Sequence, residues 1–294
     1  MTIFRFGVFR LTIKPNADYE NVGDVLAAID EGDLESSYEA DFLRELYDLK
    51  KEAKPTSWIG KFRKFRTSDL PHVGKPGGEE KELDLDEDAG LIERNFFMFI
   101  PSKEVLIWQP NRHASSPKQF ATFLSEVTGV KVTYEPFLQP DAMKRIMGKD
   151  LIFKKIRLRV ARPTNADYYP PSKWSQRVFD LLAGGGGDSL YLEVALDGRK
   201  AEKNQTQVDK RWRRALREFT KDELATTAEA IVIDEGVEHP IDLLADRIES
   251  PQEIDFPGRY PPSQMMVKAL KDAWLDVRGQ VNEIIGNEDE ALDI

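Results

Sequence analysis

The sequence contains no cysteine, and this absence excludes several classes of functional site. A chain without cysteine has no disulfide framework, no thiolate nucleophile and no cysteine-ligated zinc or iron–sulfur centre. Only three histidines are present, and none of them stands in the spacing of a recognised metal-binding or catalytic motif. We therefore expect neither a metal nor another cofactor.

Long apolar runs are also absent from the sequence. No stretch approaches the roughly 20 residues that are needed to cross a bilayer. The first residues lack the apolar core and the cleavage site that are typical of a signal peptide. We therefore expect a cytoplasmic protein that does not insert into a membrane.

Charge is plentiful and unevenly distributed. The 294 residues include 42 Lys and Arg against 52 Asp and Glu, which gives a formal net charge of −10. Residues 154–217 hold 15 Lys and Arg against 7 Asp and Glu, whereas residues 218–294 hold 6 against 19. An acidic protein can still bind an anion through a local basic region, because salt screens charges beyond roughly 8–10 Å.

The hydrophobic pattern predicts an α+β fold of mixed sheets and packed helices, with two lobes. We place an N-terminal lobe at residues 1–150, with an acidic loop at about 67–90, and a C-terminal lobe at residues 151–294 that ends in a long helix and an acidic tail. The predicted strands include Thr2–Lys14, Trp58–Arg66, a hairpin over residues 95–109, Leu151–Arg162, Ser189–Leu196 and Ala228–Asp234. The predicted helices include Asn21–Ile29, Ser37–Leu49, a capped helix that begins after Ser116, Gln176–Leu182, Glu202–Phe219 and Gln264–Ile285.

The predicted helix Glu202–Phe219 is amphipathic, and its polar face is basic. That face carries Lys203, Lys210, Arg213, Arg214 and Arg217. Like charges at helical spacing repel each other by a few tenths of a kcal/mol per pair, so an anionic group should offset them. Nucleic-acid phosphate is one candidate, and the acidic C-terminal third of the chain or an acidic partner is the other.

The predicted strand Leu151–Arg162 repeats this pattern at a period of two. Lys155, Arg157 and Arg159 lie on one face, and Ile156, Leu158 and Val160 lie on the other. The basic face favours either cross-strand pairing with acidic neighbours or a track for backbone phosphates.

The segment Trp58–Arg66 interleaves aromatic residues with Lys61, Arg63, Lys64 and Arg66. Such a mixture suits single-stranded nucleic acid, whose bases stack on rings while cations hold the backbone. The aromatic residues could equally belong to the core.

Several short phrases of this sequence resemble a family of uncharacterised bacterial proteins of about 300 residues. These phrases are Trp58-Ile59-Gly60, Ser68-Asp69-Leu70-Pro71, Gly90-Leu91-Ile92-Glu93, Pro136-Phe137, Pro140-Asp141 and Ile241-Asp242-Leu243-Leu244. None of them is a catalytic signature. The resemblance implies an association with mobile elements and a role in defence against phage or plasmids.

We therefore expect a non-enzymatic protein that binds nucleic acid without sequence preference through the basic surface at 154–217. The alternative is a regulatory or structural protein whose basic face docks an acidic protein or a second copy of itself. A metal-dependent nuclease that uses Glu193, Asp197 and Lys200 is a third hypothesis, which no motif supports.

Overall fold

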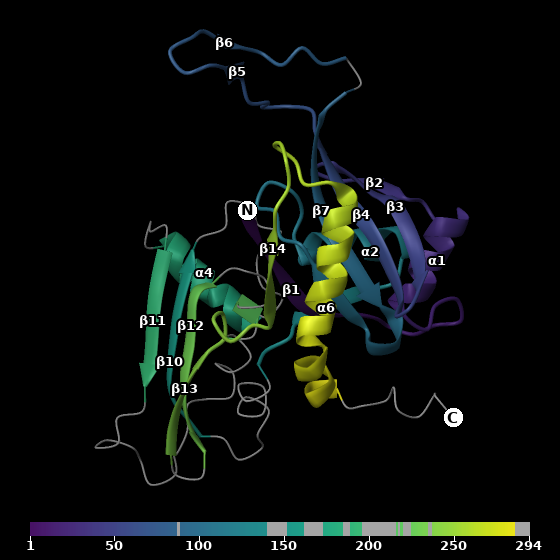
Figure 1. Cartoon of the computed structure of the whole chain (residues 1–294). Coiled ribbons are helices and arrows are strands. Elements are labelled where there is room, and N and C mark those ends of the chain that lie inside the picture. Colours follow the sequence, from purple (N-terminus) through teal and green to yellow (C-terminus); the bar gives the residue numbers. More distant parts are fainter. Residues whose placement is uncertain are drawn as a thin grey trace. The chain divides into compact units, whose positions relative to one another are not determined.

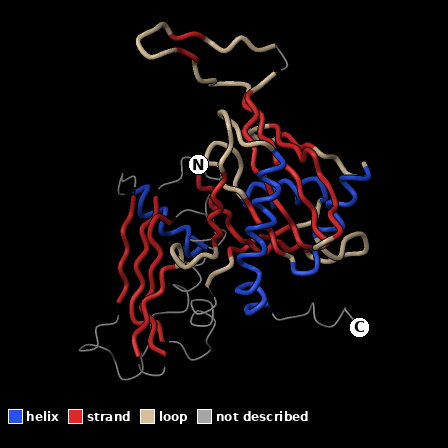
Figure 2. Tube along the Cα trace, in the orientation of Figure 1, coloured by secondary structure: helices blue, strands red, loops and turns tan. Residues whose placement is uncertain are grey.

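The chain forms two compact units, which are described here separately. A computed structural model describes residues 1–86, 89–139, 152–161, 173–184, 189–195, 216, 218–219, 225–234 and 237–285 (Figure 1). The first unit comprises Met1–Glu135 and Glu249–Gly279, and the second comprises Pro136–Ile248 and Gln280–Ile294. Each unit combines antiparallel strands with helices (Figure 2), so the predicted α+β class is confirmed.

The first unit is built on an eight-stranded sheet. Its order is β14 (Glu249–Ile254), β1 (Thr2–Ile13), β8 (Val105–Trp108), β7 (Leu91–Ile100), β4 (Thr56–Arg66), β3 (Leu43–Ala53) and β2 (Ser37–Glu39), and β9 (Val132–Pro136) also pairs with β1. The predicted hairpin is confirmed as β7 and β8, which are joined by the 3-10 helix η1 (Pro101–Lys103). The segment predicted as a loop carries a short hairpin of β5 (Val73–Gly74) and β6 (Glu80–Lys81). The pairing of β14 with β1 was not anticipated from the sequence.

Two helices, α1 (Val22–Glu31) and α2 (Pro117–Thr128), pack on one face of this sheet. Both begin with a capping box, and the one at Ser116 confirms the predicted helix start. The ring of Phe62 on β4 lies 5.1 Å from that of Phe120 and 5.2 Å from that of Phe123, both on α2. These contacts belong to an aromatic core in which most side chains are fully buried.

The long helix α6 (Ser263–Ile285), predicted as Gln264–Ile285, crosses the sheet and contacts both β14 and β3 (Figure 1). Ser250 of β14 donates to the Asp276 carboxylate at 2.7 Å, and Lys271 lies 3.2 Å from a carboxylate oxygen of Glu52 on β3. The apolar side of α6, which includes Trp274, is buried.

The predicted helix at Ser37–Leu49 is wrong, because this segment forms β2 and the first half of β3. A β-bulge explains why the spacing of Leu43, Leu46 and Leu49 indicated a helix. Tyr47 pairs with Lys61 and Lys50 pairs with Ile59, so Asp48 and Leu49 together oppose Gly60. The additional residue turns Leu49 to the core face that Leu46 already occupies, which imitates the three-residue spacing of a helix.

The second unit contains a four-stranded sheet in the order β11 (Ser189–Ala195), β10 (Ile152–Ala161), β12 (Ala225–Asp234) and β13 (Val237–Asp242), together with α4 (Lys173–Gly184). Ile156, Leu158 and Val160 are buried in its core, as the alternation of β10 predicted. Leu216 and Phe219, two apolar residues within the predicted helix Glu202–Phe219, are buried in the same core.

Candidate functional site

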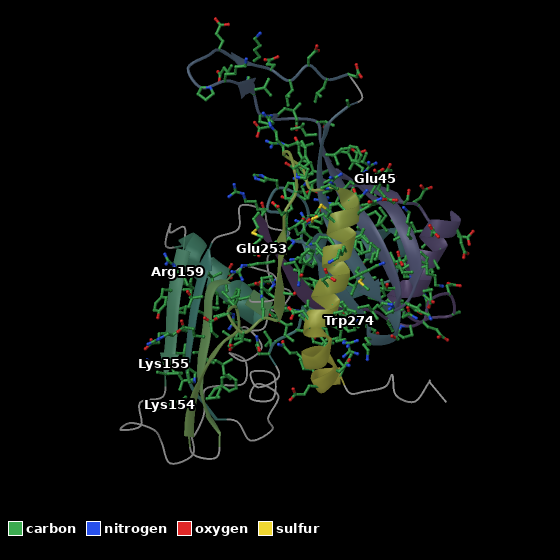
Figure 3. All side chains as sticks on the ribbon, in the orientation of Figure 1. Glu45, Lys154, Lys155, Arg159, Glu253 and Trp274 are labelled. Atoms are coloured by element: carbon green, nitrogen blue, oxygen red, sulfur yellow. The ribbon has the colours of Figure 1, made fainter. Side chains whose placement is uncertain are left out.

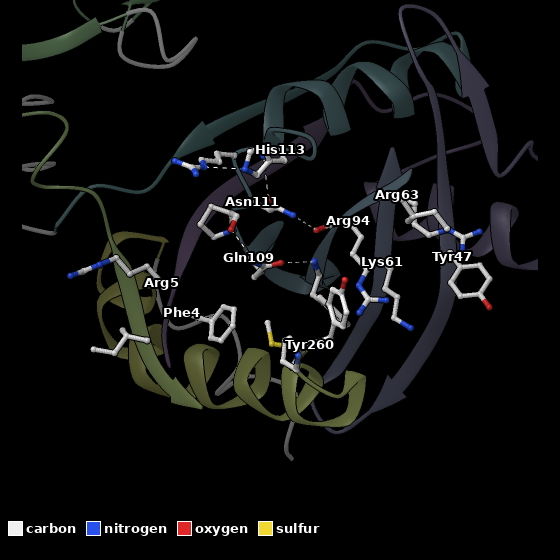
Figure 4. Close-up of a pocket in the computed structure, with 17 residues that line it drawn as sticks. Phe4, Arg5, Tyr47, Lys61, Arg63, Arg94, Gln109, Asn111, His113 and Tyr260 are labelled. Atoms are coloured by element: carbon white, nitrogen blue, oxygen red, sulfur yellow. Dashed lines mark hydrogen bonds between the residues drawn. The ribbon is translucent and has the colours of Figure 1, made fainter. Parts of the chain in front are cut away.

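A cavity of about 890 Å³ lies on the α6 side of the first sheet (Figure 4). Its wall combines parts of β1, β3, β4 and β7 with residues 109–113 and the start of α6. None of the described residues that line it is Asp or Glu. The basic side chains that line the cavity are those of Arg5, Lys61, Arg63, Arg94 and Arg112, together with His113. A concave site lined by one sign of charge concentrates ligands of the opposite sign, so the cavity favours an anion.

Strand β4 divides the four cations that the sequence grouped together. Lys61 and Arg63 are two residues apart, so they share one face of β4, and this face lines the cavity. Lys64 instead donates to one carboxylate oxygen of Glu93 at 2.9 Å, and Arg66 lies 4.0 Å from the other oxygen. Only Lys61 and Arg63 therefore belong to the cavity.

The β-bulge in β3 places a carboxylate beside Lys61. Asp48 adopts a left-handed conformation with φ of 55°, and its carboxylate accepts a hydrogen bond from Lys61 Nζ at 2.9 Å. Lys50 Nζ lies 2.7 Å from the other oxygen. Hydrogen bonds from Lys50 and Lys61 hold the pKa of Asp48 below its ordinary value. The Lys61 ammonium also lies 5.5 Å from the centre of the Tyr47 ring, so Lys61 is held at the wall of the cavity.

Two arginines face each other across β4 and β7. Arg63 and Arg94 are register partners, and both line the cavity. Arg63 contacts Glu45 and stacks 3.8 Å from the centre of the Tyr47 ring, but its buried Nε has no hydrogen-bond partner among the described residues. Burial and the charge of Arg94 both lower the pKa of Arg63. Like charges placed directly opposite each other destabilise a sheet, and Glu45 offsets part of the charge of Arg63, so a further anion between the two arginines would reduce their repulsion.

Residues 109–113 brace the same wall from the side. Asn111 Nδ2 donates to the backbone carbonyl of Arg94 at 3.1 Å, and Gln109 Oε1 accepts from the backbone N–H of Phe96 at 3.3 Å. Arg112 Nε donates to His113 Nε2 at 3.1 Å. These contacts fix the backbone beside Arg94 and add a fourth guanidinium, that of Arg112, to Arg5, Arg63 and Arg94.

Exposed apolar side chains surround these cations. Tyr47 is 49% exposed and Tyr260 is 79% exposed, and both line the cavity (Figure 4). Ile3 and Ile92, which also line it, are exposed large hydrophobic residues as well. Tyrosine rings at the edge of a basic cavity can stack on a planar ligand. The site therefore combines positive charge with accessible aromatic surface.

The sequence analysis missed Arg5, Arg94 and Arg112. A usable signal existed for Arg94, because Ile92, Arg94 and Phe96 share one face of β7 by simple alternation. No comparable signal marks Arg5 or Arg112, which reach the cavity through strand order and loop path rather than through a local pattern.

In the second unit, the predicted basic face of β10 is present, and Figure 3 labels Lys155 and Arg159 on this strand. Acidic side chains of both neighbouring strands meet this face. Lys155 Nζ and Arg157 Nε each lie 2.8 Å from an oxygen of Glu193 on β11, and Arg157 also reaches Glu229 on β12 at 3.4 Å. Arg159 is exposed. Cross-strand pairing, one of the two readings of this strand, is thus confirmed for Lys155 and Arg157.

These pairs shift the ionisation of both partners. Hydrogen bonds from Lys155 and Arg157 lower the pKa of Glu193, and the bond to Glu193 raises the pKa of Arg157. A groove of about 410 Å³ beside them is lined by both Lys155 and Arg157 and by the carboxylates of Glu229, Asp242 and Asp246. Its mixed charge contrasts with the uniformly basic lining of the first unit's cavity.

The basic residues predicted on the helix Glu202–Phe219 lie outside the described residues. They are Lys203, Lys210, Arg213, Arg214 and Arg217. Asp197 and Lys200, which were considered with Glu193 for a nuclease site, also lie outside them.

Within the described ranges, no three His, Asp or Glu side chains group as potential metal ligands. In the same part of the chain, no helix is both long enough and apolar enough to cross a bilayer. A search of curated proteins finds no match. A family model described as a family of unknown function (DUF6731) matches residues 43–279, a range that includes Lys61, Arg63 and Arg94. Because this match covers most of the 294 residues, the chain belongs to the DUF6731 family.

Proposed function

We propose that the protein is a non-enzymatic binder of nucleic acid, and that the cavity of the first unit holds a single strand. The observation that carries this proposal is the lining of the cavity, which is basic and aromatic and includes no carboxylate among the described residues. Phosphate oxygens would meet Lys61, Arg63 and Arg94, while bases would stack on Tyr47 and Tyr260. Recognition by phosphate contacts and stacking depends little on sequence.

A single strand fits this site better than a duplex does. The side chains of Lys61 and Arg63 are only 11% and 19% exposed, so a ligand must enter the cavity to reach them. A duplex is stiff and keeps its bases stacked inside, whereas a single strand can bend inward and offer its bases to the tyrosines.

The second unit supports the alternative role more directly. Lys155 and Arg157 have carboxylate partners, as Lys61 and Arg63 do, but here carboxylates also line the adjacent groove. Such a groove suits the docking of a charged protein segment or of a second copy of the chain. A contribution of the basic residues at 154–217 to nucleic-acid binding stays within our proposal.

We further propose that the protein acts in the cytoplasm and that its nucleic-acid binding serves defence against phage or plasmids. This biological role rests on the sequence resemblance alone. It predicts that the nucleic acid bound in the cell comes from an invading element.

The test is the binding of short single-stranded DNA and RNA across a salt series, with Arg94→Gln as the site variant. Removing a charged hydrogen-bond donor should weaken binding by about 1.5–3 kcal/mol, or roughly tenfold or more. The matched control is Arg10→Gln, which removes the same charge from β1 at a side chain that is 51% exposed and pairs with Glu104 outside the cavity.

Equal losses of affinity in Arg94→Gln and Arg10→Gln would contradict the site, because the cavity would then contribute nothing beyond net charge. Cleavage of the strand in the presence of Mg²⁺ would favour the nuclease hypothesis instead. Tighter binding of duplex than of single strands would contradict the stacking role of the tyrosines.

A further inference from the structure

We propose that the cavity receives a terminal phosphomonoester of a nucleic-acid strand, seated between Arg63 and Arg94, and that it can receive the same group of a free mononucleotide. This inference rests on the proposed function and deepens it. The protein then recognises the phosphorylated ends of nucleic-acid strands rather than their internal phosphodiesters.

The first argument is the placement of the two guanidinium groups. Arg63 and Arg94 stand directly opposite each other on neighbouring strands, and both line the cavity. Glu45 contacts Arg63 from β3, on the side of β4 away from β7, so it does not stand between the two arginines. A phosphate between them would accept hydrogen bonds from both groups and remove their repulsion.

The second argument is an unused donor. Nε of Arg63 is buried and has no hydrogen-bond partner among the described residues, and the same holds for Oε1 of Glu45, which contacts Arg63 through Nη2. A buried N–H without a partner is costly, and native proteins rarely keep one without a reason. A guanidinium presents its donors in one plane and binds phosphate oxygens in pairs, so a small shift of Arg63 toward the cavity would let a phosphate accept from Nε together with a terminal nitrogen.

The third argument concerns charge and access. A phosphomonoester carries about −1.5 to −2 charges at pH 7, whereas each internal phosphodiester carries one. Lys61, which pairs with Asp48, adds a third cation that is largely buried, at 11% side-chain exposure. Charges interact more strongly where water is partly excluded, so this site should bind a phosphomonoester more tightly than a phosphodiester.

The cavity also has room for the nucleoside that carries such a phosphate. Its volume of about 890 Å³ lies within the range of small-molecule sites. The rings of Tyr47 and Tyr260 border it, and both are accessible for stacking on a base. When a strand end is bound, the nucleic-acid chain leaves the cavity in one direction only. An internal phosphate is joined to nucleotides on both sides, so the cavity must make room for two chain segments.

The test is isothermal titration calorimetry with short, unlabelled thymidine oligonucleotides that carry a 5′-phosphate, a 3′-phosphate or hydroxyl groups at both ends. We expect one phosphorylated end to increase affinity about tenfold over the hydroxyl strand. The increase should disappear in Arg94→Gln and persist in Arg10→Gln. Thymidine monophosphate with its phosphate at the preferred end should compete with the strand, and thymidine should not.

Equal affinities for all three strands would overturn this inference and leave the proposed function intact. Absence of binding by every strand would overturn both. A preference for the phosphorylated end that persists in Arg94→Gln would overturn the placement between the two arginines. If Arg94→Gln does not fold, as judged by circular dichroism, Arg63→Gln takes its place, and the comparison of strand ends on the unaltered protein still decides.

Discussion

Replacing Gly60 by alanine tests the bulge that shapes the cavity wall. A Cβ atom at Gly60 would lie 2.9 Å from Phe97 Cζ, 3.0 Å from Phe97 Cε1 and 3.2 Å from Leu49 Cδ1. Phe97 is fully buried, so its ring cannot move without disturbing the aromatic core. Overpacking of this kind costs about 1–3 kcal/mol, and the propensity gain of alanine over glycine recovers roughly 0.5–1 kcal/mol.

The expected net loss in the free energy of unfolding is therefore roughly 0–2.5 kcal/mol, centred near 1 kcal/mol. Urea denaturation should show it as a lower midpoint with an unchanged slope. Gly279→Ala is the matched control, because Gly279 lies in α6 with nothing within 4 Å of an added Cβ, and this variant should gain about 0.5–1 kcal/mol. If Gly60→Ala is as stable as the unaltered protein, the close packing of Phe97 and Leu49 against Gly60 is wrong.

Three further predictions concern individual side chains. The pKa of Asp48 is lowered from 3.8, so its ion pairs stabilise the fold above about pH 4 and are lost as the pH falls through the folded pKa. Urea unfolding should therefore show a constant stability difference between the unaltered protein and Asp48→Asn from pH 7 to 5. Below pH 4 this difference should shrink. Tyr260→Ala should weaken single-strand binding by about 1–3 kcal/mol without changing the melting temperature, because the side chain is 79% exposed and acts by stacking. Glu193→Gln removes the carboxylate charge that faces Lys155 and Arg157, so it should steepen the salt dependence of binding if β10 contacts phosphate, and an unchanged slope would exclude that strand from the interface.

Local patterns in the sequence predicted the elements that depend on local physics. The alternation of β10 placed Lys155 and Arg157 on one face and Ile156 and Leu158 in the core, as the structure confirms. The capping box at Ser116 likewise marked the start of α2. In both cases the residues that decide the structure are neighbours along the chain.

The features that escaped prediction depend on contacts between distant residues. The bulge at Asp48 gave β3 the spacing of a helix, and only the pairing with Gly60 reveals it. The cavity joins Arg5, Arg63 and Arg94 from three strands whose order in the sheet no local pattern reports. A search for clustered basic residues along the sequence therefore pointed to 154–217, whereas the described structure gathers its uniformly basic cavity in the first unit.

The most direct test of the central claim is the salt dependence of single-strand binding by the unaltered protein and by Arg94→Gln. If Lys61, Arg63 and Arg94 neutralise about three charges of the strand, log affinity plotted against log salt should have a slope of about −2, and loss of one cation should reduce its magnitude by about 0.7. The account predicts this reduction in Arg94→Gln and a smaller one in Arg10→Gln. Identical slopes in all three proteins, or no binding at low salt, would contradict a nucleic-acid site in this cavity.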